Sequence, residues 1–487
     1  MSCSAPDLVA VVVGAGMSGL CAAVALKAAG LSFVVLEKSE DIGGTWAANR
    51  YPGCACDIPS HLYGYSFAPN PSWSRVWAGQ AEILDYLRDV VDRFGLREHI
   101  RLGAAAEHAA FDPQTDTWIV QSGGQTLRAR YLIGATGPLR VPKFPDIPGI
   151  DDFAGPSMHS ARWDRGIELT GQRVGIIGAA ASAVQMIPKL APQTAHLTVF
   201  QRTANYIVPK PNRAYTRPEK WAMAHVPGCW RLLRWLLYWR YELRFHAAFT
   251  PDRPPAALVE RLLRGNIARQ IADPVLRQKV LPRYRLGCKR VLLEGDYYAS
   301  LQRDDVSLIT DSIARIEPRG VVTEDGLHAL DVLIYATGFD IWDTGWQARV
   351  FGRDGQSMAS VFGDAPRAWL GMAVPGFPNF FSLLGPNTGL GHNSVVWMVE
   401  CQVNHIIRLM NAAAEAGQTS LEVREEVVEA YSADIHARMQ KRVWMRGGCA
   451  SWYQHPDGMI RSLWPDSTFA FWRTLQRVDL RDYRPPR

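Results

Sequence analysis

Residues 8–37 read LVAVVVGAGMSGLCAAVALKAAGLSFVVLE, and this stretch decides the fold. The apolar, β-rich run Leu8–Val13 predicts a strand that is buried on both faces. The motif Gly14-Ala-Gly16-Met-Ser-Gly19 follows it, and then come an alanine-rich helical run and a second apolar run. A strand, a GxGxxG turn, a helix and a strand in this order are typical of a βαβ unit that binds a dinucleotide.

Each glycine of the turn serves a separate physical need. Gly14 allows the tight turn, Gly16 lets a pyrophosphate approach the backbone, and Gly19 lets the helix pack closely on the strand. The helix N-terminus offers unpaired N–H groups and a positive dipole end to the phosphates. Glu37 follows the second strand, 23 residues after Gly14, where a carboxylate accepts from ribose hydroxyls and repels a 2′-phosphate. The first site therefore favours FAD or NAD over NADP.

A second unit of the same kind follows later in the chain. Apolar runs over 174–177 and 197–200 flank the turn GAAASA at 178–183 and a helical segment. After the second run stand Arg202 and Thr203 in place of an acid. A guanidinium matches the 2′-phosphate of NADP in charge and geometry, so this unit indicates an NADP site.

The second turn departs from the ideal motif at Ala180, whose Cβ lies where a pyrophosphate should contact the backbone, whereas Ala183 is an allowed variant. A structural remnant of a dinucleotide fold is therefore the alternative to an NADP site. The residues that we expect to bind NADP here are Gly178, Ala180, Ser182, Arg202 and Thr203.

Two Ala-Thr-Gly segments, at 135–137 and 336–338, each follow a short apolar run. Such segments are expected where a chain leaves one dinucleotide domain and later re-enters it. The sequence therefore predicts an α/β fold with two Rossmann-like domains, the second inserted into the first, and a helical insertion. The expected parts are the FAD-binding domain (1–150 and 335–487), the NADP-binding domain (151–214 and 281–334) and the helical insertion (215–280).

The helical insertion contains the segment CWRLLRWLLYWR at 229–240. Tryptophan and arginine together are typical of a helix that lies on a membrane surface. An amphipathic helix that covers the substrate cavity explains the same residues, and we favour this second interpretation.

The composition excludes several classes of protein. Of the 487 residues, 47% are hydrophobic and 21% are charged, which is typical of a large globular protein and not of a disordered chain. The net charge is only +6 without a long basic run, so we expect no nucleic-acid partner. Leu8–Leu26 is uncharged, but Asp7 before it and the glycines within it argue against a signal peptide or a spanning helix. We therefore expect a cytoplasmic protein without a membrane partner.

The eight cysteines contain no CxxC pair; they stand at 3, 21, 54, 56, 229, 288, 401 and 449. Their scatter over a long chain predicts reduced thiols and no metal site. Two nucleotide sites, one for a flavin and one for NADP, imply hydride transfer from NADPH to FAD. A disulfide reductase would also need a redox cysteine pair, and Cys54-Ala-Cys56 has the wrong spacing for one.

Between the two turns lies the segment FAGPSMHSARWD at 153–164. It resembles the fingerprint FxGxxxHxxxW, followed by Pro or Asp, of the type I Baeyer–Villiger monooxygenases, a group of class B flavoprotein monooxygenases. Relatives that oxygenate amines and sulfides carry a different version of this pattern. The resemblance therefore implies an FAD- and NADPH-dependent enzyme that oxygenates ketones.

Further segments resemble the same family over nearly the whole chain. Gly43-Gly44-Thr45-Trp46, Tyr51-Pro-Gly and Asp57-Ile-Pro-Ser look like its flavin-side loop, and Cys288-Lys289-Arg290 looks like the segment with its active-site arginine. The resemblance implies that Gly44, Thr45, Trp46, Asp57 and Tyr63 lie at the flavin, and that Lys289 helps Arg202 and Thr203 to hold the 2′-phosphate. Asn387 in a later Gly-Pro-Asn segment is a further candidate for contact with the flavin.

In the family, a C4a-peroxyflavin formed from O₂ attacks a ketone and gives an ester or lactone. The resemblance assigns catalysis to Arg290, whose permanent charge stabilises negative oxygen, and to Asp57, which orients Arg290. His159 and Trp163 of the fingerprint take a structural or gating role, and His392 is expected to be a hydrogen-bonding residue near the flavin. Two alternatives stay open: oxygenation of sulfur or nitrogen, and a flavin-binding protein in which Ala180 impairs the use of NADP.

Overall fold

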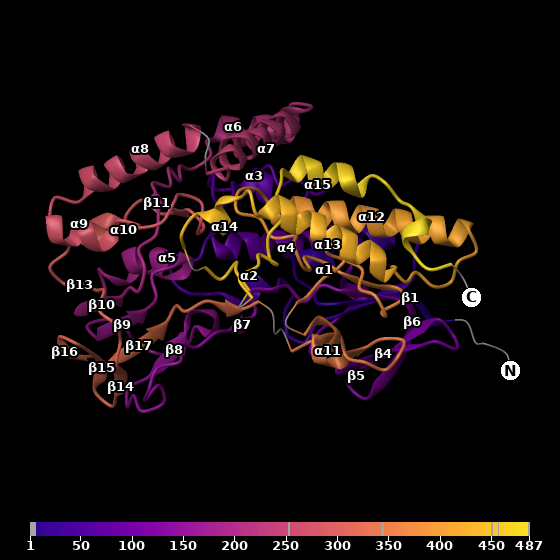
Figure 1. The fold of residues 1–487 in the computed structure, drawn as a ribbon. Helices are drawn as coiled ribbons and strands as arrows, with labels where there is room; N and C mark the ends of the chain where they lie inside the picture. The colour runs from indigo at the N-terminus through magenta and orange to yellow at the C-terminus, as the bar shows by residue number, and fades with distance from the viewer. Residues whose placement is uncertain are drawn as a thin grey trace.

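The computed structural model describes residues 6–251, 254–341, 345–363, 365–449, 451–455 and 457–485. Its largest sheet has eight strands, in the order β19-β4-β5-β6-β1-β2-β3, with β20 also paired to β6 (Figure 1). Its strands are β1 (Leu8–Val13), β2 (Phe33–Leu36), β3 (Ile100–Arg101), β4 (His108–Asp112), β5 (Thr117–Ser122), β6 (Gln125–Gly134), β19 (Val350–Phe351) and β20 (Phe380–Ser382).

Strand β1 lies inside this sheet, paired in parallel with β2 on one side and with β6 on the other. Its side chains alternate between two hydrophobic cores: Ala10 and Val12 pack in one, and Val11 and Val13 in the other. This burial on both faces explains why the strand is apolar at every position rather than at every second one.

The second sheet has five parallel strands, in the order β13-β10-β9-β17-β8. They are β8 (Ser157–His159), β9 (Arg173–Ile177), β10 (His196–Phe200), β13 (Val306–Ile309) and β17 (Val332–Tyr335). All of them lie in the chain between β6 and β19, so the second unit is inserted into the first. The residue boundaries of the parts stay a prediction, because sheet membership does not define where a domain ends.

The two crossings between the units lie side by side. Strand β7 (Val141–Pro142) leaves the first unit, β18 (Phe339–Asp340) returns towards it, and the two pair antiparallel. The remaining strands are β11 (Ile207–Val208), β12 (Leu292–Leu293), β14 (Arg315–Glu317), β15 (Gly320–Thr323) and β16 (Gly326–Ala329).

The helices of the nucleotide units and of the inserted region are α1 (Met17–Ala28), α2 (Thr45–Ala48), α3 (Ser60–Tyr63), α4 (Gln80–Arg93), α5 (Ala181–Leu190), α6 (Arg217–His225), α7 (Cys229–Ala248), α8 (Pro254–Gln270), α9 (Pro274–Val280) and α10 (Tyr297–Ser300). After β19 come α11 (Met358–Phe362), α12 (Val395–Glu415), α13 (Glu425–Met439), α14 (Val443–Arg446) and α15 (Thr468–Leu475). Helix α12 packs on α1 and α15, so the last part of the chain covers the first nucleotide unit (Figure 1). In the part of the chain that the structure describes, no helix combines the length and the apolar character needed to cross a bilayer.

Candidate active site

The glycines of the first turn divide into two kinds. A Cβ on Gly14 would lie 2.6 Å from the Ala135 carbonyl oxygen, and one on Gly19 would lie 1.8 Å from the Gly14 carbonyl oxygen. The fold itself therefore requires these two glycines. A Cβ on Gly16 would come no closer than 3.5 Å to Gly44, which is ordinary contact. The fold does not need glycine at position 16, and a ligand that approaches the backbone there explains its presence.

Glu37 is buried at the end of β2 and faces the same turn. Its carboxylate accepts from the backbone N–H of Ala15 at 2.8 Å and of Ser39 at 2.9 Å. Two carboxylate oxygens offer about four acceptor positions, so the pair of hydroxyls on a ribose still finds partners. These acceptors fit an adenosine ribose without a 2′-phosphate, in agreement with the first site being the flavin site.

The expected flavin-side loop folds against this turn. Gly44 adopts φ +54°, and a Cβ on it would lie 3.0 Å from the Cα of Gly16, so the two glycines face each other. Thr45 and Trp46 begin the short helix α2, and the Trp46 indole Nε1 donates to the Tyr63 hydroxyl at 3.0 Å. Burial raises the pKa of Tyr63 well above its ordinary value, so this hydroxyl remains protonated and able to donate.

Asp57 and Arg290 form a close ion pair, although they are 233 residues apart. The Arg290 Nε donates to the Asp57 Oδ2 at 2.6 Å, and its Nη1 donates to the Leu390 carbonyl at 3.3 Å. Burial favours neutral Asp57, but the charge and hydrogen bond of Arg290 outweigh burial and hold the pKa of the Asp57 carboxyl below its usual value. The Asp57 charge in turn keeps the pKa of Arg290 above its usual value, against the effect of burial. Both groups are therefore ionised at any pH at which the protein works.

The loop that carries Asp57 is attached to the second nucleotide unit. The Tyr51 hydroxyl donates to the Gln185 side chain on α5 at 2.8 Å, and the Gln185 amide donates to the Ala55 carbonyl at 2.9 Å. A Cβ on Gly53 would lie 2.4 Å from the Gln185 carbonyl oxygen, so the loop packs directly on this helix. Asp57 is thus held next to the helix that begins at the second turn.

Three residues near the ion pair have no motif that indicates them. The Lys210 ammonium donates to the Cys56 carbonyl at 2.9 Å, and burial lowers its pKa. Tyr453 is buried and lies close enough to Arg290 and Asp57 for both charges to act on its hydroxyl. Tyr241 on α7 also lies in the field of Asp57, and burial raises its pKa to about 12. A tyrosine or lysine in a helix or loop carries no spacing signal, which is why the sequence did not predict these residues.

The second turn resembles the first in its backbone. Gly178 adopts φ +114°, and a Cβ on it would lie 2.4 Å from the Ala336 carbonyl oxygen, so the fold requires this glycine. Ala180 precedes α5 at φ −90° and ψ −162°, a conformation that alanine adopts readily, and Ser182 lies in the first turn of that helix. The alanine at 180 therefore costs the fold nothing, and its effect on a dinucleotide is a separate question.

Arg202 follows β10, and Lys289 precedes β12; their shared role at a 2′-phosphate stays a prediction. Burial lowers the pKa of Lys289, and the charge of Arg202 lowers it further, so Lys289 lies in the electrostatic field of Arg202. Among the described contacts neither cation is in an ion pair with a carboxylate, and the Lys289 ammonium lies 5.4 Å from the centre of the Tyr284 ring. Two adjacent cations without an acidic partner fit a dianion such as a 2′-phosphate. Thr203 follows directly.

The fingerprint residues lie where the units meet. His159 ends β8, is 1% exposed, and its ring lies edge-on to Phe144 and Phe339 on the two crossing segments. Burial lowers the pKa of His159 to about 4, so the ring is neutral. Trp163 packs against the core of the second unit. These contacts agree with a structural or gating role and bring no reacting group to the ion pair.

The two later candidates are engaged within the protein. The Asn387 amide donates to the carbonyls of Ile460 and Leu463, both at 3.0 Å, which leaves only its oxygen for a flavin contact. His392 is buried with its Nε2 3.4 Å from the Glu242 carboxylate on α7. Its described contact is therefore with Glu242, and the expected hydrogen bond near the flavin stays a prediction.

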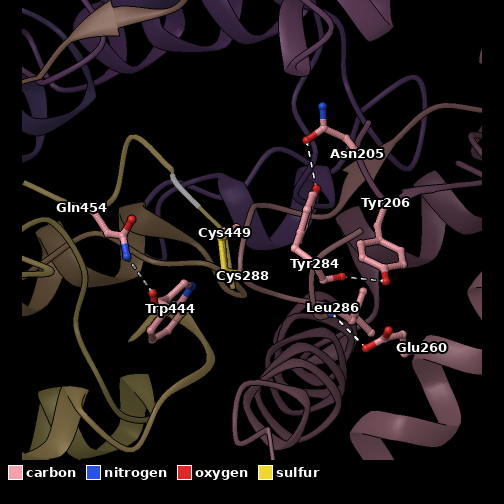
Figure 2. The surroundings of a disulfide bond; sticks show 9 residues. All are labelled: Asn205, Tyr206, Glu260, Tyr284, Leu286, Cys288, Trp444, Cys449 and Gln454. Atoms are coloured by element: carbon pink, nitrogen blue, oxygen red, sulfur yellow. Dashed lines mark hydrogen bonds between the residues drawn. A yellow bond between two sulfur atoms is a disulfide. The ribbon is translucent and has the colours of Figure 1, made fainter. Parts of the chain in front are cut away.

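The expectation that all cysteines are reduced thiols is wrong for two of them. Cys288 and Cys449 form a disulfide between segments that are 161 residues apart (Figure 2). The segments touch closely, because the Arg285 N–H donates to the Gly447 carbonyl at 3.0 Å. Spacing along the chain does not reveal such a pair, since only the fold brings the segments together. The bond ties the segment that carries Arg290 to the loop that carries Tyr453. Cys54 and Cys56 are free thiols, as are Cys21, Cys229 and Cys401, and Cys3 lies outside the described residues.

The site combines two dinucleotide-binding turns with the permanent positive charge of Arg290. The hydrogen bonds of Arg290 to Asp57 and Leu390 take two of the five N–H donors of a guanidinium. The other donors can bind an oxygen that gains negative charge during a reaction. The site therefore suits oxygen chemistry at a carbonyl that is driven by a reduced cofactor.

Comparison with known proteins agrees with this site. The sequence profile described as pyridine nucleotide-disulphide oxidoreductase matches residues 11–216, which contain both turns. The chain is 41% identical over 478 residues to a Baeyer-Villiger monooxygenase of Streptomyces coelicolor, covering 97% of this chain and 92% of the relative. It is 38% identical over 476 residues to a Baeyer-Villiger monooxygenase of Pseudomonas aeruginosa, covering 97% of this chain and 90% of the relative.

Two solved structures have the same architecture. Cyclohexanone monooxygenase from Rhodococcus sp. Phi1 bound to NADP+ superposes with a TM-score of 0.86 at 32% identity, covering 97% of both chains. OTEMO in complex with FAD and NADP superposes with a TM-score of 0.88 at 28% identity, covering 97% of this chain and 98% of the other. These likenesses confirm the expected α/β fold and the resemblance in the fingerprint. The chain belongs to the Baeyer–Villiger monooxygenase family.

Proposed function

We propose that this chain is an FAD-containing, NADPH- and O₂-dependent monooxygenase that converts a ketone to an ester or lactone. The observation that carries the proposal is the Arg290–Asp57 pair at 2.6 Å, on a loop that is packed against the helix of the second dinucleotide turn. A permanent cation at this junction is what the insertion of oxygen next to a carbonyl requires, because negative charge develops on oxygen.

The residues of the two cradles fit the two cofactors. Gly16, Gly44 and Glu37 would hold FAD, with Trp46 and Tyr63 on the side of the ion pair. The turn at Gly178, with Arg202 and Lys289, would hold NADP. When bound, NADPH supplies hydride, and the reduced flavin supplies the activated oxygen.

The chain's own residues bind the substrate oxygen, orient the guanidinium of Arg290 and shield the site from water. Arg290 donates hydrogen bonds to the substrate oxygen as it becomes negative, and Asp57 fixes the direction in which the guanidinium points. Tyr63 and Tyr453 keep their protons, so they contribute hydrogen-bond donors and no competing negative charge. Helix α7 packs over α3, next to the flavin-side loop, and helps to exclude water from the site.

The test is product analysis with the purified holoenzyme. Cyclohexanone is the first ketone to offer, since a similar enzyme is named for it. We expect NADPH-dependent lactone that carries one atom of labelled oxygen from ¹⁸O₂. A thioether offered in parallel separates the rival function: sulfoxide without any ester would establish a heteroatom oxygenase instead.

The place of reaction follows from the cofactor. NADPH is regenerated in the cytoplasm, so we propose that the enzyme acts there. The disulfide Cys288–Cys449 is unusual in a reducing compartment, and thiol titration of the freshly isolated protein would establish whether it is present in the cell.

A further inference from the structure

Helix α7 in the inserted region is inverted relative to an ordinary surface helix. Its buried face carries two charged residues, Arg234 and Glu242, beside the core tyrosines Tyr238 and Tyr241. It exposes large apolar side chains instead: Leu232 is 59% exposed, Trp235 56%, Leu236 51% and Leu243 66%. A surface helix of a globular protein normally buries its leucines and exposes its charges. The inversion therefore needs an explanation.

The buried face is fixed by hydrogen bonds and cannot simply rotate outwards. The Arg234 Nη1 donates to the carbonyls of His61, Leu62 and Gly64 at 2.9, 3.2 and 2.6 Å. The Glu242 carboxylate accepts from the Asn393 amide and from the Thr468 N–H and hydroxyl, each at 2.7 Å. Turning the leucines inwards would leave both charges without these partners, which is costly. The orientation of α7 is thus a property of the fold.

Four exposed apolar residues and the partly buried Trp239 form one continuous stripe. At roughly 100° per residue, Leu232, Leu236, Trp239 and Leu243 fall within about 60° of one another around the helix, with Trp235 beside them. We call these five residues the α7 apolar stripe. Trp239 packs against Phe469 on α15, at 6.1 Å between ring centres, and Phe469 is itself 42% exposed. The neighbouring helix α8 also presents apolar side chains, Leu258 and Leu262, to solvent.

The exposed charges around the stripe are of one sign. Arg231 and Arg240 flank it on its two sides. Among the described residues of α6–α8, the exposed Asp, Glu, Lys and Arg side chains are all arginines: Arg217, Arg231, Arg240, Arg261 and Arg269. The described acidic residues of these helices are not exposed. Glu242 is buried, and Glu219 and Glu260 are partly buried, in ion pairs with Arg213 and Arg264 respectively. The surface that presents the stripe is therefore apolar and cationic.

We propose that the α7 apolar stripe docks on the surface of an anionic lipid bilayer, with the helix parallel to the membrane plane. Leucine and tryptophan side chains would enter the boundary between headgroups and acyl chains, and the flanking arginines would pair with lipid phosphates. Helices α6, α7 and α8 lie along the upper edge of the molecule in Figure 1, on the opposite side from β4 and β5 of the first sheet. Docking there leaves both nucleotide units outside the lipid.

Charge favours a bilayer over a second copy of the chain. In a symmetric dimer built on this stripe, the arginines of one copy would face those of the other without an exposed carboxylate on α6–α8 to pair with. The inner face of α7 packs on α3, and its role as a cover of the substrate cavity stays a prediction. The membrane-surface interpretation, which the sequence analysis favoured less, concerns the outer face. A helix can cover the site with one face and contact a membrane with the other, so the two interpretations do not exclude each other.

The test is flotation of the FAD-loaded enzyme with lipid vesicles. We expect binding to vesicles of equimolar phosphatidylcholine and phosphatidylglycerol, weaker binding at high salt, and little binding to pure phosphatidylcholine. The double variant Leu236→Gln/Leu243→Gln should weaken binding about tenfold, while Leu327→Gln, at a 40% exposed leucine on β16, should not. Arg231→Gln/Arg240→Gln should weaken binding to the anionic vesicles only, with Arg319→Gln as its control.

The outcomes distinguish the occupants of the stripe. All of these positions are exposed, so flavin content and unfolding temperature should stay unchanged, which separates lost docking from misfolding. Light scattering should find the same oligomeric state for the double variant as for the parent. The proposal is overturned if the parent ignores anionic vesicles, if Leu327→Gln weakens binding as much as the double variant, or if the double variant dissociates a stable dimer.

Discussion

Replacing Arg290 should separate the two halves of the catalytic cycle. The guanidinium is held by Asp57 at 2.6 Å and by the Leu390 carbonyl at 3.3 Å, and it has N–H donors left for a substrate oxygen. The residues assigned to NADP binding are others. Arg290→Ala should therefore remove stabilisation of negative oxygen and leave hydride transfer from NADPH intact.

The size of the effect follows from what is lost. Removing a single oxyanion donor typically slows catalysis about 10²–10³-fold, equivalent to about 2.7–4 kcal/mol, and Arg290 contributes a full charge as well. We expect ester formation by Arg290→Ala to fall by at least this factor. Asp57→Asn should have a smaller effect, because the charge on Arg290 remains and only its direction is lost. Arg290→Lys should lie between the two, since one ammonium cannot both pair with Asp57 and reach the substrate as a fork does.

Two assays on the same preparation measure this. Anaerobic stopped-flow mixing with NADPH follows bleaching of the flavin, and product analysis in air follows the ester. Arg283→Ala is the matched control, because Arg283 is an exposed arginine on the same segment. If flavin reduction and ester formation fall together in Arg290→Ala, Arg290 serves cofactor binding. If the ester persists, the proposed role is wrong.

Five further substitutions test the two dinucleotide sites and the framework. Gly16→Ala should change the free energy of unfolding by less than about 1 kcal/mol and weaken FAD binding, whereas Gly14→Ala should lower the free energy of unfolding by about 1–3 kcal/mol. Denaturant unfolding measures the stability, and titration of the apoprotein with FAD measures the binding. An equal loss of stability in the two variants would contradict the assignment of Gly16 to the ligand and Gly14 to the fold. Ala180→Gly should tighten NADP binding and speed flavin reduction in stopped flow, and unchanged rates would show that the Cβ does not limit this site. Cys449→Ser should lower the unfolding free energy by about 2–5 kcal/mol in urea, and reductant should then affect the parent but not the variant. Burial alone would raise the pKa of Glu242, but its hydrogen-bond partners and the His392 charge outweigh burial and lower the pKa from 4.5 to about 2. The ionised Glu242 therefore stabilises the folded protein above pH 4.5, and this contribution is lost as the pH falls towards 2. The free energy of unfolding measured across this range should show this loss in the parent and not in Glu242→Gln.

Local steric demands could be predicted from the sequence, and long-range encounters could not. A Cβ on Gly19 would meet Gly14 of the same turn, and the glycine spacing is a known local pattern, so the strand, turn and helix could be predicted directly. Asp57 and Arg290 are 233 residues apart, and only the resemblance to a family suggested that they meet. Lys210 and Tyr453 stand near the same pair without any motif, because their position is set by how the units pack.

Helix α7 shows why hydropathy alone could not orient an element. Judged by transfer energies, Leu232 and Leu243 belong inside and Arg234 and Glu242 outside. The fold reverses this because the carbonyls at the end of α3 and the donors of Asn393 and Thr468 satisfy both charges. Which face of a helix is buried depends on the hydrogen-bond partners that the neighbouring elements supply, and the sequence of the helix does not contain those elements. An exposed leucine therefore indicates a docking surface only where the structure shows that the opposite face of the helix is fixed by its own hydrogen bonds.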